Sequence, residues 1–182
     1  LTMKRTALFL DRDGVINIDK EYLYKIEDFD FIDGIFDLIT HARNIGYLII
    51  IITNQSGIGR GIFTDEDFQK LNNWMIDKLK DKGAEIDSVY YCATHPTKGI
   101  GEYKTIDKRR KPSPGMFFEA MRDHNVDLSK SIMLGDKISD MEAATLAGIQ
   151  NLFLLSSEKK FQNSINISSL KEVIKFLKKI KC

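Results

Sequence analysis

The feature that most constrains this chain is a short apolar run that ends in two aspartates. Residues 6–10 have the length and composition of a buried strand, and Asp11, Arg12, Asp13 and Gly14 follow directly. The glycine indicates a turn at this point. Two carboxylates this close repel each other unless a cation lies between them, and Mg²⁺ prefers oxygen ligands. The motif alone fits either a metal site at the edge of a sheet or a simple Asp-Gly turn.

Composition limits the class of protein. With 182 residues, 43% of them hydrophobic and 29% charged, the chain is expected to form a single domain over residues 1–182. The net charge of +1 gives no basic field for nucleic acids or membranes. The chain has no apolar run of about 18 residues, and residues 6–10 are too short for the core of a signal peptide. The only cysteines, Cys92 and Cys182, suggest free thiols in the cytoplasm.

Strand-like and helix-like patterns alternate along the chain. Five segments have the pattern of strands: residues 6–10, 47–52, 86–92, 131–136 and 149–155. Between them, apolar residues recur every three or four positions, which predicts amphipathic helices. Residues 29–32 alternate and predict a short extra strand, whereas residues 156–168 are polar and predict an irregular segment. The alternation predicts an α/β fold, a three-layer α/β/α sandwich around a mainly parallel sheet.

Polar side chains occur at four places, either directly after one of these apolar runs or in a loop between them. They are Asp11, Asp13, Thr53, Asn54, Arg110, Lys111, Asp136 and Asp140. Because the carboxyl ends of parallel strands lie on one edge of a sheet, we expect these groups to converge. Residues 53–61 also contain three glycines, whose exposed backbone N–H groups can cradle an anion. The basic run at residues 108–111 fits either an anion site or a solvated surface segment.

These motifs resemble the haloacid dehalogenase superfamily of phosphohydrolases, which has a Rossmann-like fold and uses Mg²⁺. The match rests on Asp11-x-Asp13, Thr53, Lys111 and Gly135-Asp136 with Asp140. The segments 9–17, 53–61, 110–112 and 135–137 resemble one branch in particular, the D-glycero-D-manno-heptose 1,7-bisphosphate phosphatases and histidinol-phosphate phosphatases. The resemblance extends over nearly the whole chain.

The resemblance implies a role for each motif. Asp11 would be the nucleophile that forms an aspartyl-phosphate, and Asp13 would protonate the leaving oxygen and then activate water. Thr53 and Lys111 would hold the phosphoryl group. The metal ligands would be Asp11, the backbone carbonyl of Asp13, and Asp136. Since Asp13 must be protonated for its first role, we expect its neighbour Asp11 and shielding from water to raise its pKa.

Other residues would contact the rest of the substrate. These predicted substrate-binding residues are Asp19, Tyr22, Asn54, Gln55, Ser56, Arg60, Arg110 and Lys137. Asp140 is expected to orient either Lys111 or a metal-bound water. The implied reaction is hydrolysis of the 7-phosphate of D-glycero-D-manno-heptose 1,7-bisphosphate, a step towards ADP-heptose and lipopolysaccharide, by a monomer acting on a small phosphorylated sugar. The alternatives are a histidinol-phosphate phosphatase and a non-catalytic phosphate-binding or receiver-type switch.

Two departures from the family stand out. Many heptose bisphosphate phosphatases carry a zinc loop, Cys-x-His followed by Cys-x-Cys. Here Cys92 is followed by Thr94 and His95 in a different spacing, and residues 107–109 contain no cysteine. Structural zinc requires four nitrogen or sulfur ligands, so we expect no zinc. The large cap domain of many relatives is also absent, and we expect a minimal cap, an open site and a long loop over residues 93–110.

Overall fold

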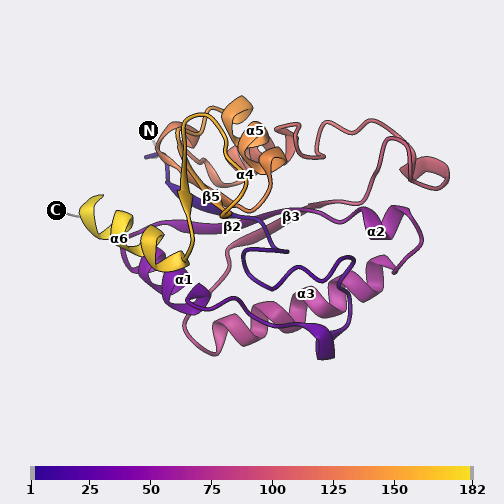
Figure 1. Cartoon of the computed structure of the whole chain (residues 1–182), viewed down its shortest axis with the longest axis horizontal. Coiled ribbons are helices and arrows are strands. Elements are labelled where there is room, and N and C mark those ends of the chain that lie inside the picture. The colour runs from indigo at the N-terminus through magenta and orange to yellow at the C-terminus, as the bar shows by residue number, and fades with distance from the viewer. Residues whose placement is uncertain (1–2, 181–182) are drawn as a thin grey trace.

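A parallel sheet forms the centre of the molecule (Figure 1). The computed structural model describes residues 3–180, and the sheet in this range has six strands. The strands are β1 (Ala7–Leu10), β2 (Leu48–Asn54), β3 (Ser88–Cys92), β4 (Ile132–Gly135), β5 (Asn151–Leu155) and β6 (Ser164–Ile167). Their spatial order is β3-β2-β1-β4-β5-β6, and every neighbouring pair is parallel. The predicted α/β/α sandwich is confirmed, with β1 and β4 side by side at its centre.

Helices connect the strands. The α-helices are α1 (Ile35–Asn44), α2 (Ser56–Gly59), α3 (Asp65–Lys80), α4 (Gly115–His124), α5 (Ile138–Ala147) and α6 (Leu170–Ile180). Three 3-10 turns lie at η1 (Ile26–Asp28), η2 (Gly101–Tyr103) and η3 (Leu128–Lys130). The helix α3 begins at a capping box, in which the side chains of Thr64 and Asp67 each accept a hydrogen bond from the other's backbone N–H.

The helices cover both faces of the sheet, with α1, α3 and α6 on one side and α4 and α5 on the other (Figure 1). The strand β1 therefore buries every side chain: Leu8 and Leu10 face the first layer of helices, and Ala7 and Phe9 face the second. The ring of Phe9 meets the edge of Phe117 on α4 at 5.0 Å between centroids. This two-sided burial explains why the strand is apolar throughout.

Two predictions about strands are wrong. The polar segment 156–168 contains β6, whose residues pair with β5 from Ser164 to Ile167. It is an edge strand in which only Ile167 is buried, so its sequence lacks an apolar run. Residues 29–32 form no strand, and Phe31 makes only an isolated bridge with Asn17. The alternation there arises because Phe29 and Phe31 pack on the ring of Trp74.

The segment 18–28, here called the flap, is a loop that leaves the sheet after β1 and returns to the same place. A 2.9 Å hydrogen bond connects the N–H of Ile18, at its start, to the carbonyl of Asp30, two residues beyond its end. Tyr24 in the flap stacks on Phe63, just before α3, at 5.5 Å, so the flap lies beside that helix (Figure 1). The flap accounts for the minimal cap that the sequence predicts.

Three further observations bear on the sequence predictions. No helix in residues 3–180 is long and apolar enough to cross a membrane. Cys92 is a buried free thiol, and Cys182 lies outside the described residues. The prediction of one domain over residues 1–182 stays a prediction.

Candidate active site

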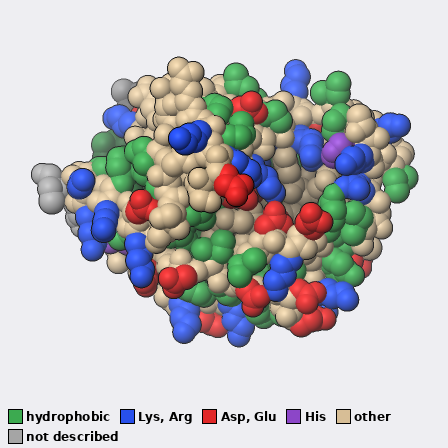
Figure 2. Space-filling model, viewed as in Figure 1, with side chains coloured by type: hydrophobic (Ala, Val, Ile, Leu, Met, Phe, Trp, Pro, Cys, Tyr) green, Lys and Arg blue, Asp and Glu red, His purple; other side chains and the backbone are tan. Residues whose placement is uncertain are grey.

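A cavity of about 630 Å³ opens at the carboxyl ends of the central strands. Figure 2 shows the hollow, with acidic side chains on one side of it and a group of lysine, arginine and histidine side chains on the other. The predicted site residues that line it are Asp11, Asp13, Asp19, Tyr22, Asn54, Gln55, Ser56, Arg110, Lys111 and Lys137. Asp140 also lines it, together with residues that sequence reasoning had not assigned to the site: Glu21, Gly57, Pro112 and Ser139. The other predicted residues, Thr53, Arg60 and Asp136, are not in its lining.

A buried ion-pair triad lies at the floor of the cavity. The Nζ atom of Lys111 is 3.0 Å from Oδ1 of Asp11 and 2.6 Å from Oδ1 of Asp140. It also donates to the backbone carbonyl of Ile52, at 2.7 Å. Burial alone would lower the pKa of Lys111, but the two carboxylates raise it above its usual value. The ammonium group is therefore held as a cation between the two carboxylates.

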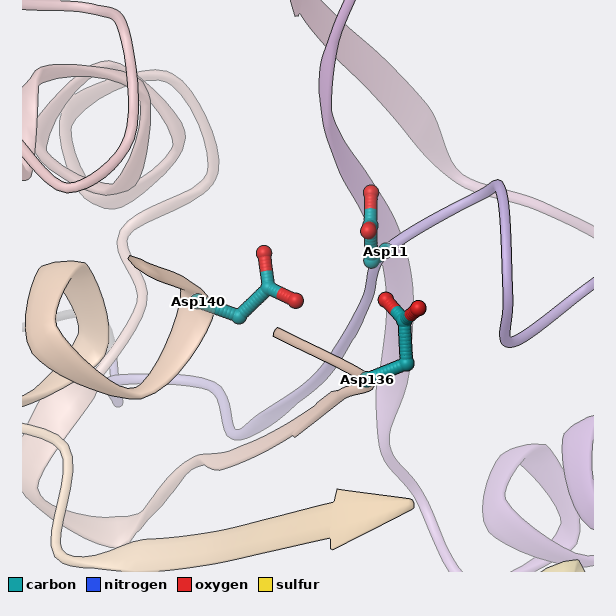
Figure 3. A group of neighbouring side chains, drawn as sticks. All are labelled: Asp11, Asp136 and Asp140. Atoms are coloured by element: carbon teal, nitrogen blue, oxygen red, sulfur yellow. The ribbon is translucent and has the colours of Figure 1, made fainter. Parts of the chain in front are cut away.

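Three carboxylates converge at the floor of the cavity (Figure 3). Asp11 follows β1, Asp136 follows β4, and Asp140 comes from the first turn of α5, and one oxygen of each lies within 4.8 Å of the others. Burial and the charge of Asp140 raise the pKa of Asp11 to about 8 and that of Asp136 to about 6. A cation placed among these carboxylates would favour their ionised forms.

This cluster fits a divalent cation bound by oxygen. Oδ1 of Asp136 is buried and has no hydrogen-bond partner among the described residues. Gly14, with φ of 91°, keeps the space open, because a Cβ there would lie 2.3 Å from Oδ2 of Asp136. The donors are hard oxygen atoms, which suits Mg²⁺. The side chain of Asp13 lies outside this group, as expected if its backbone carbonyl is the ligand.

The carboxylate of Asp13 has different partners from that of Asp11. It accepts hydrogen bonds from Arg12 at 3.0 and 3.1 Å, from Asn17 at 3.0 Å and from Gln55 at 2.9 Å. Burial would raise the pKa of Asp13, but Arg12 and these hydrogen bonds lower it below its usual value. The predicted rise in the pKa of Asp13 is therefore wrong for this arrangement. The prediction considered Asp11 as the neighbour and missed the cation of Arg12.

The loop after β2 is tied to the loop that carries Lys111. The side chain of Asn54 donates to the carbonyl of Lys111 at 2.9 Å and accepts from its N–H at 3.1 Å. Thr53 is 1% exposed, and its hydroxyl accepts a 3.0 Å hydrogen bond from Gln55. Gln55 thus connects Thr53 to Asp13, and Ser56 begins the short helix α2. These bonds fix the two loops around the floor of the cavity.

Longer polar side chains surround the mouth of the cavity. The Nζ of Lys137 lies 3.1 Å from the carboxylate of Asp19. Burial would lower the pKa of Lys137, but the negative charges of Asp11, Asp136 and Asp19 raise it above its usual value. The ring of Tyr22 lies under the guanidinium of Arg60, at 4.8 Å from its centroid. These two contacts attach the flap to opposite sides of the cavity. Arg110 donates to the carbonyl of Thr94 at 3.0 Å, which holds it away from Lys111.

The positions that would carry zinc in relatives contact one another directly. The Sγ of Cys92 lies 3.1 Å from the hydroxyl of Thr94 and 3.5 Å from Oδ2 of Asp107. The Nδ1 of His95 instead accepts hydrogen bonds from the N–H groups of Thr97 and Lys98. Burial raises the pKa of the Cys92 thiol, which favours its protonated form. The absence of zinc stays a prediction.

Sequence reasoning missed Arg12 and Asn17 as members of the site, although both lie in the first motif. Both are completely or almost completely buried and bond to Asp13. Their residue types gave no signal, because arginine and asparagine are usually exposed. The three-dimensional arrangement alone brings them to the acid.

Comparisons with known proteins agree with this geometry. The family model described as polynucleotide kinase 3 phosphatase matches residues 9–176. The chain is 46% identical to the D-glycero-alpha-D-manno-heptose-1,7-bisphosphate 7-phosphatase of Burkholderia mallei, covering 96% of this chain and 95% of that one. It is 42% identical to the D-glycero-beta-D-manno-heptose-1,7-bisphosphate 7-phosphatase of Photorhabdus laumondii, over 100% of both chains.

A solved structure shows the same fold. The crystal structure of D,D-heptose 1,7-bisphosphate phosphatase from B. bronchiseptica, complexed with magnesium and phosphate, superposes with a TM-score of 0.82 and 26% identity. The superposition covers 96% of this chain and 99% of that chain. The chain belongs to the haloacid dehalogenase superfamily and, within it, to the family of D-glycero-D-manno-heptose-1,7-bisphosphate 7-phosphatases.

Proposed function

We propose that this chain hydrolyses the 7-phosphate of D-glycero-D-manno-heptose 1,7-bisphosphate through an aspartyl-phosphate. The observation that carries the proposal is the triad at the floor of the cavity, in which Lys111 lies between Asp11 and Asp140. It presents a carboxylate and a fixed cation to one side of a space that a phosphoryl group would fill. Relatives at 46% and 42% identity act on this substrate according to their names.

In the first step, an oxygen of Asp11 attacks the phosphorus, and the bond from phosphorus to the sugar oxygen breaks. The sugar oxygen takes a proton from Asp13, so a free hydroxyl leaves. Lys111 neutralises charge on the transferred phosphoryl group, which is the main requirement of phosphoryl transfer. Asp140 holds the ammonium of Lys111 at 2.6 Å and so fixes its direction.

In the second step, Asp13 accepts a proton from a water molecule while the oxygen of that water attacks the phosphorus. The bond between phosphorus and Asp11 breaks, which releases inorganic phosphate and restores the carboxylate. Asp13 is ionised in the arrangement described here, which suits this step. For the first step it must bind a proton, and the negative charge of an arriving phosphate raises its pKa towards that state.

Mg²⁺ fits the oxygen cluster, and the residues that would hold it are Asp11, Asp136 and the backbone carbonyl of Asp13. When bound, it would supply positive charge beside the phosphate and compensate the carboxylates of the cluster. Thr53 would also hold the phosphoryl group, because its hydroxyl accepts a bond from Gln55 and keeps its own proton for donation.

The other end of the substrate would meet the mouth of the cavity. Arg110, Lys137 and Asp19 line it, with Tyr22 from the flap, and Arg60 lies at its edge. The pKa of His95 is lowered first by burial and then by the nearby positive charges of Arg110, Lys98 and Arg60. Such a group of cations suits the phosphate that does not react. We propose a monomeric cytoplasmic enzyme that takes a free sugar phosphate and no nucleic acid.

A direct assay tests the proposal. Purified protein with Mg²⁺ is given both anomers of the heptose bisphosphate, and histidinol phosphate separately. We expect phosphate release from the heptose substrate with the 1-phosphate retained, which phosphorus NMR distinguishes. Asp11→Asn should abolish turnover and leave the circular dichroism spectrum unchanged. Faster hydrolysis of histidinol phosphate would assign the enzyme to the other branch, and a stable phosphorylated protein without turnover would support the switch alternative.

A further inference from the structure

Arg12 has the largest side chain among the fully buried residues in the described part of the chain. Only 1% of it is exposed, and arginine is almost never fully buried unless its charge is paired. None of the steps proposed above uses its guanidinium. The burial of this cation directly beneath the reacting carboxylates therefore requires its own explanation.

The guanidinium of Arg12 uses one of its three nitrogens. Nη2 donates to both carboxylate oxygens of Asp13, at 3.0 and 3.1 Å, and to the backbone carbonyl of Leu23, at 3.1 Å. Nε and Nη1 are buried and have no hydrogen-bond partner within residues 3–180. Buried unsatisfied donors cost stability. An arginine retained for stability alone would be expected to use more of its donors, so the contacts that it does make point to a role in the site.

The second partner of Nη2 belongs to the flap. Leu23 lies in the flap, with its side chain 5% exposed, and it directly follows the tip formed by Glu21 and Tyr22. Both tip residues line the cavity and have φ near +50°, a conformation uncommon outside glycine. One amino group thus touches the proton-transfer carboxylate on one side and the backbone that covers the cavity on the other.

The guanidinium also contacts the face of an aromatic ring. The central carbon of the guanidinium lies 5.7 Å from the centre of the Phe68 ring, on α3. The N–H of Arg12 also donates to Oδ1 of Asp11, at 2.8 Å. The side chain therefore has a fixed platform, and the carbonyl of Leu23 is the contact through which the flap influences the direction of Nη2.

We propose that Arg12 is a positioning residue that sets the carboxylate of Asp13 for proton transfer according to the position of the flap. The inference rests on the proposed function, because it assumes that Asp13 transfers protons. With the flap in the position described here, Nη2 is shared between Leu23 and Asp13. If the flap moves, Nη2 loses one acceptor, and the carboxylate shifts with it. Misplacement by about 1 Å can reduce a rate about 100-fold.

Asp13 keeps two other donors when Arg12 is removed. Asn17 and Gln55 donate to its two oxygens at 3.0 and 2.9 Å. We therefore expect a variant of Arg12 to retain the acid in the site, in a less exact position. Substrate binding should change little, since Arg12 does not line the cavity. The loss should fall on the two proton transfers.

The test uses Arg12→Met and Arg12→Lys with heptose bisphosphate and with 4-nitrophenyl phosphate. For the heptose substrate, we expect Arg12→Met to lower kcat about 10- to 100-fold with KM unchanged. The nitrophenolate leaves without help from an acid, but hydrolysis of the aspartyl-phosphate still requires Asp13. Stopped-flow traces should therefore show a burst of one equivalent of nitrophenol per chain, followed by slow turnover. Arg12→Lys keeps the charge, but its side chain is one atom shorter and cannot place its nitrogen at the position of Nη2, so it should show the same burst.

Arg43→Met serves as the matched control. Arg43 pairs with Asp87 at 2.7 Å and also binds the carbonyl of Glu85, outside the cavity. Its loss removes an arginine with several partners, so it should lower stability without a burst. The proposal is overturned if the Arg12 variants behave like Arg43→Met, with equal losses of activity on both substrates and no burst. Arg12 would then be a structural residue. If Arg12→Met fails to fold, Arg12→Lys alone decides.

The connection to the flap has a separate test. Leu23→Ala removes the buried side chain that holds the carbonyl in place, and it should also produce a burst. If the flap acts through Arg12, Leu23→Ala should cause little further loss in the Arg12→Met background. Additive losses would overturn the connection. A wild type that is active on nitrophenyl phosphate but not on the heptose bisphosphate would disprove the proposed function while the burst experiment still decides the role of Arg12.

Discussion

The ammonium group of Lys111 lies 2.6 Å from Oδ1 of Asp140, and both side chains are at most 2% exposed. A buried pair of this kind has lost its hydration, and each charge depends on the other. Lys111 also approaches Asp11 at 3.0 Å, so the pair connects the first strand to the first turn of α5. The strength of this connection can be measured.

We predict that Lys111→Met lowers the free energy of unfolding by about 3–5 kcal/mol, because it leaves two buried carboxylates without their cation. Adding Asp140→Asn should recover part of the loss, since one of those carboxylates is then neutral. Urea unfolding of the two single variants and the double variant gives the coupling energy. Strictly additive losses would show that the pair is not coupled. Phosphatase activity should be lost in both variants that lack Lys111.

The pH dependence of stability without metal follows from Asp11. Its pKa is raised to about 8 in the folded protein, against an ordinary value of 3.8. Between these values the unfolded chain releases a proton that the folded chain retains, so the free energy of unfolding falls as pH rises, by up to about 1.4 kcal/mol per pH unit. Asp136, whose pKa is raised to about 6, contributes to the same decline at lower pH, so Asp11→Asn should remove the decline between about pH 6 and 8. Thermal unfolding in EDTA from pH 4 to 8 checks it, and parallel curves for both proteins would contradict it.

Mg²⁺ should oppose this decline at neutral pH. A ligand that binds only the folded state at 100 times its dissociation constant adds about 2.7 kcal/mol. We expect Mg²⁺ to raise the melting temperature of the wild type, and to do so much less in Asp136→Asn, which lacks a carboxylate whose Oδ1 is buried without a partner. Equal stabilisation of both proteins would place the ion elsewhere. Ca²⁺ serves as a comparison, since it tolerates looser coordination.

Arg110 should contribute to specificity. Arg110→Ala should reduce kcat/KM for the bisphosphate. The loss should correspond to about 1.5–3 kcal/mol of transition-state stabilisation, the range for a hydrogen bond to a charged group. A small aryl phosphate should be affected little, because it has no second phosphate to bind. Arg109→Ala is the matched control, because the neighbouring Arg109 pairs with Glu119 instead of lining the cavity. Equal losses on both substrates would move Arg110 to the reacting phosphate.

We expect purified protein to contain no stoichiometric zinc. Cys92, Thr94 and Asp107 form a hydrogen-bonded group at positions where relatives would have ligands, and the His95 ring accepts bonds from its own loop. Elemental analysis tests the metal content. A zinc chelator that spares Mg²⁺ should leave activity unchanged. About one zinc per chain would contradict the prediction and assign Cys92 and His95 as candidate ligands.

The sequence predicts the centre of this molecule better than its periphery. The strands β1, β2 and β4 are apolar because helices cover both of their faces, so their existence and their polar ends are visible in the sequence. The strand β6 lies at an edge with only Ile167 buried, and nothing in a polar segment marks it. The aromatic residues at 29 and 31 imitate a strand because they pack on Trp74.

The same division holds within the site. Asp11, Lys111 and Asp140 can be predicted to converge, because Asp11 follows a strand, Lys111 lies in the loop before a helix, and Asp140 lies in the first turn of another helix, all at one edge of the sheet. The environment of Asp13 could not be predicted, because it depends on the buried guanidinium of Arg12 and on the amides of Asn17 and Gln55. The direction of a pKa shift depends on such contacts, and these are set by side-chain packing.

The cavity is built from two kinds of structure. Its floor comes from the ends of the central strands, from the first turn of α5 and from Lys111, which is bound between Asp11 and Asp140. Its mouth comes from side chains of the flap and of the loops that carry Arg60 and Arg110. Replacing the side chains of Tyr22, Arg60 and Arg110, which take no part in the proposed reaction steps, should therefore redirect the enzyme to other phosphate esters while Lys111 and the backbone of the flap keep the reaction itself.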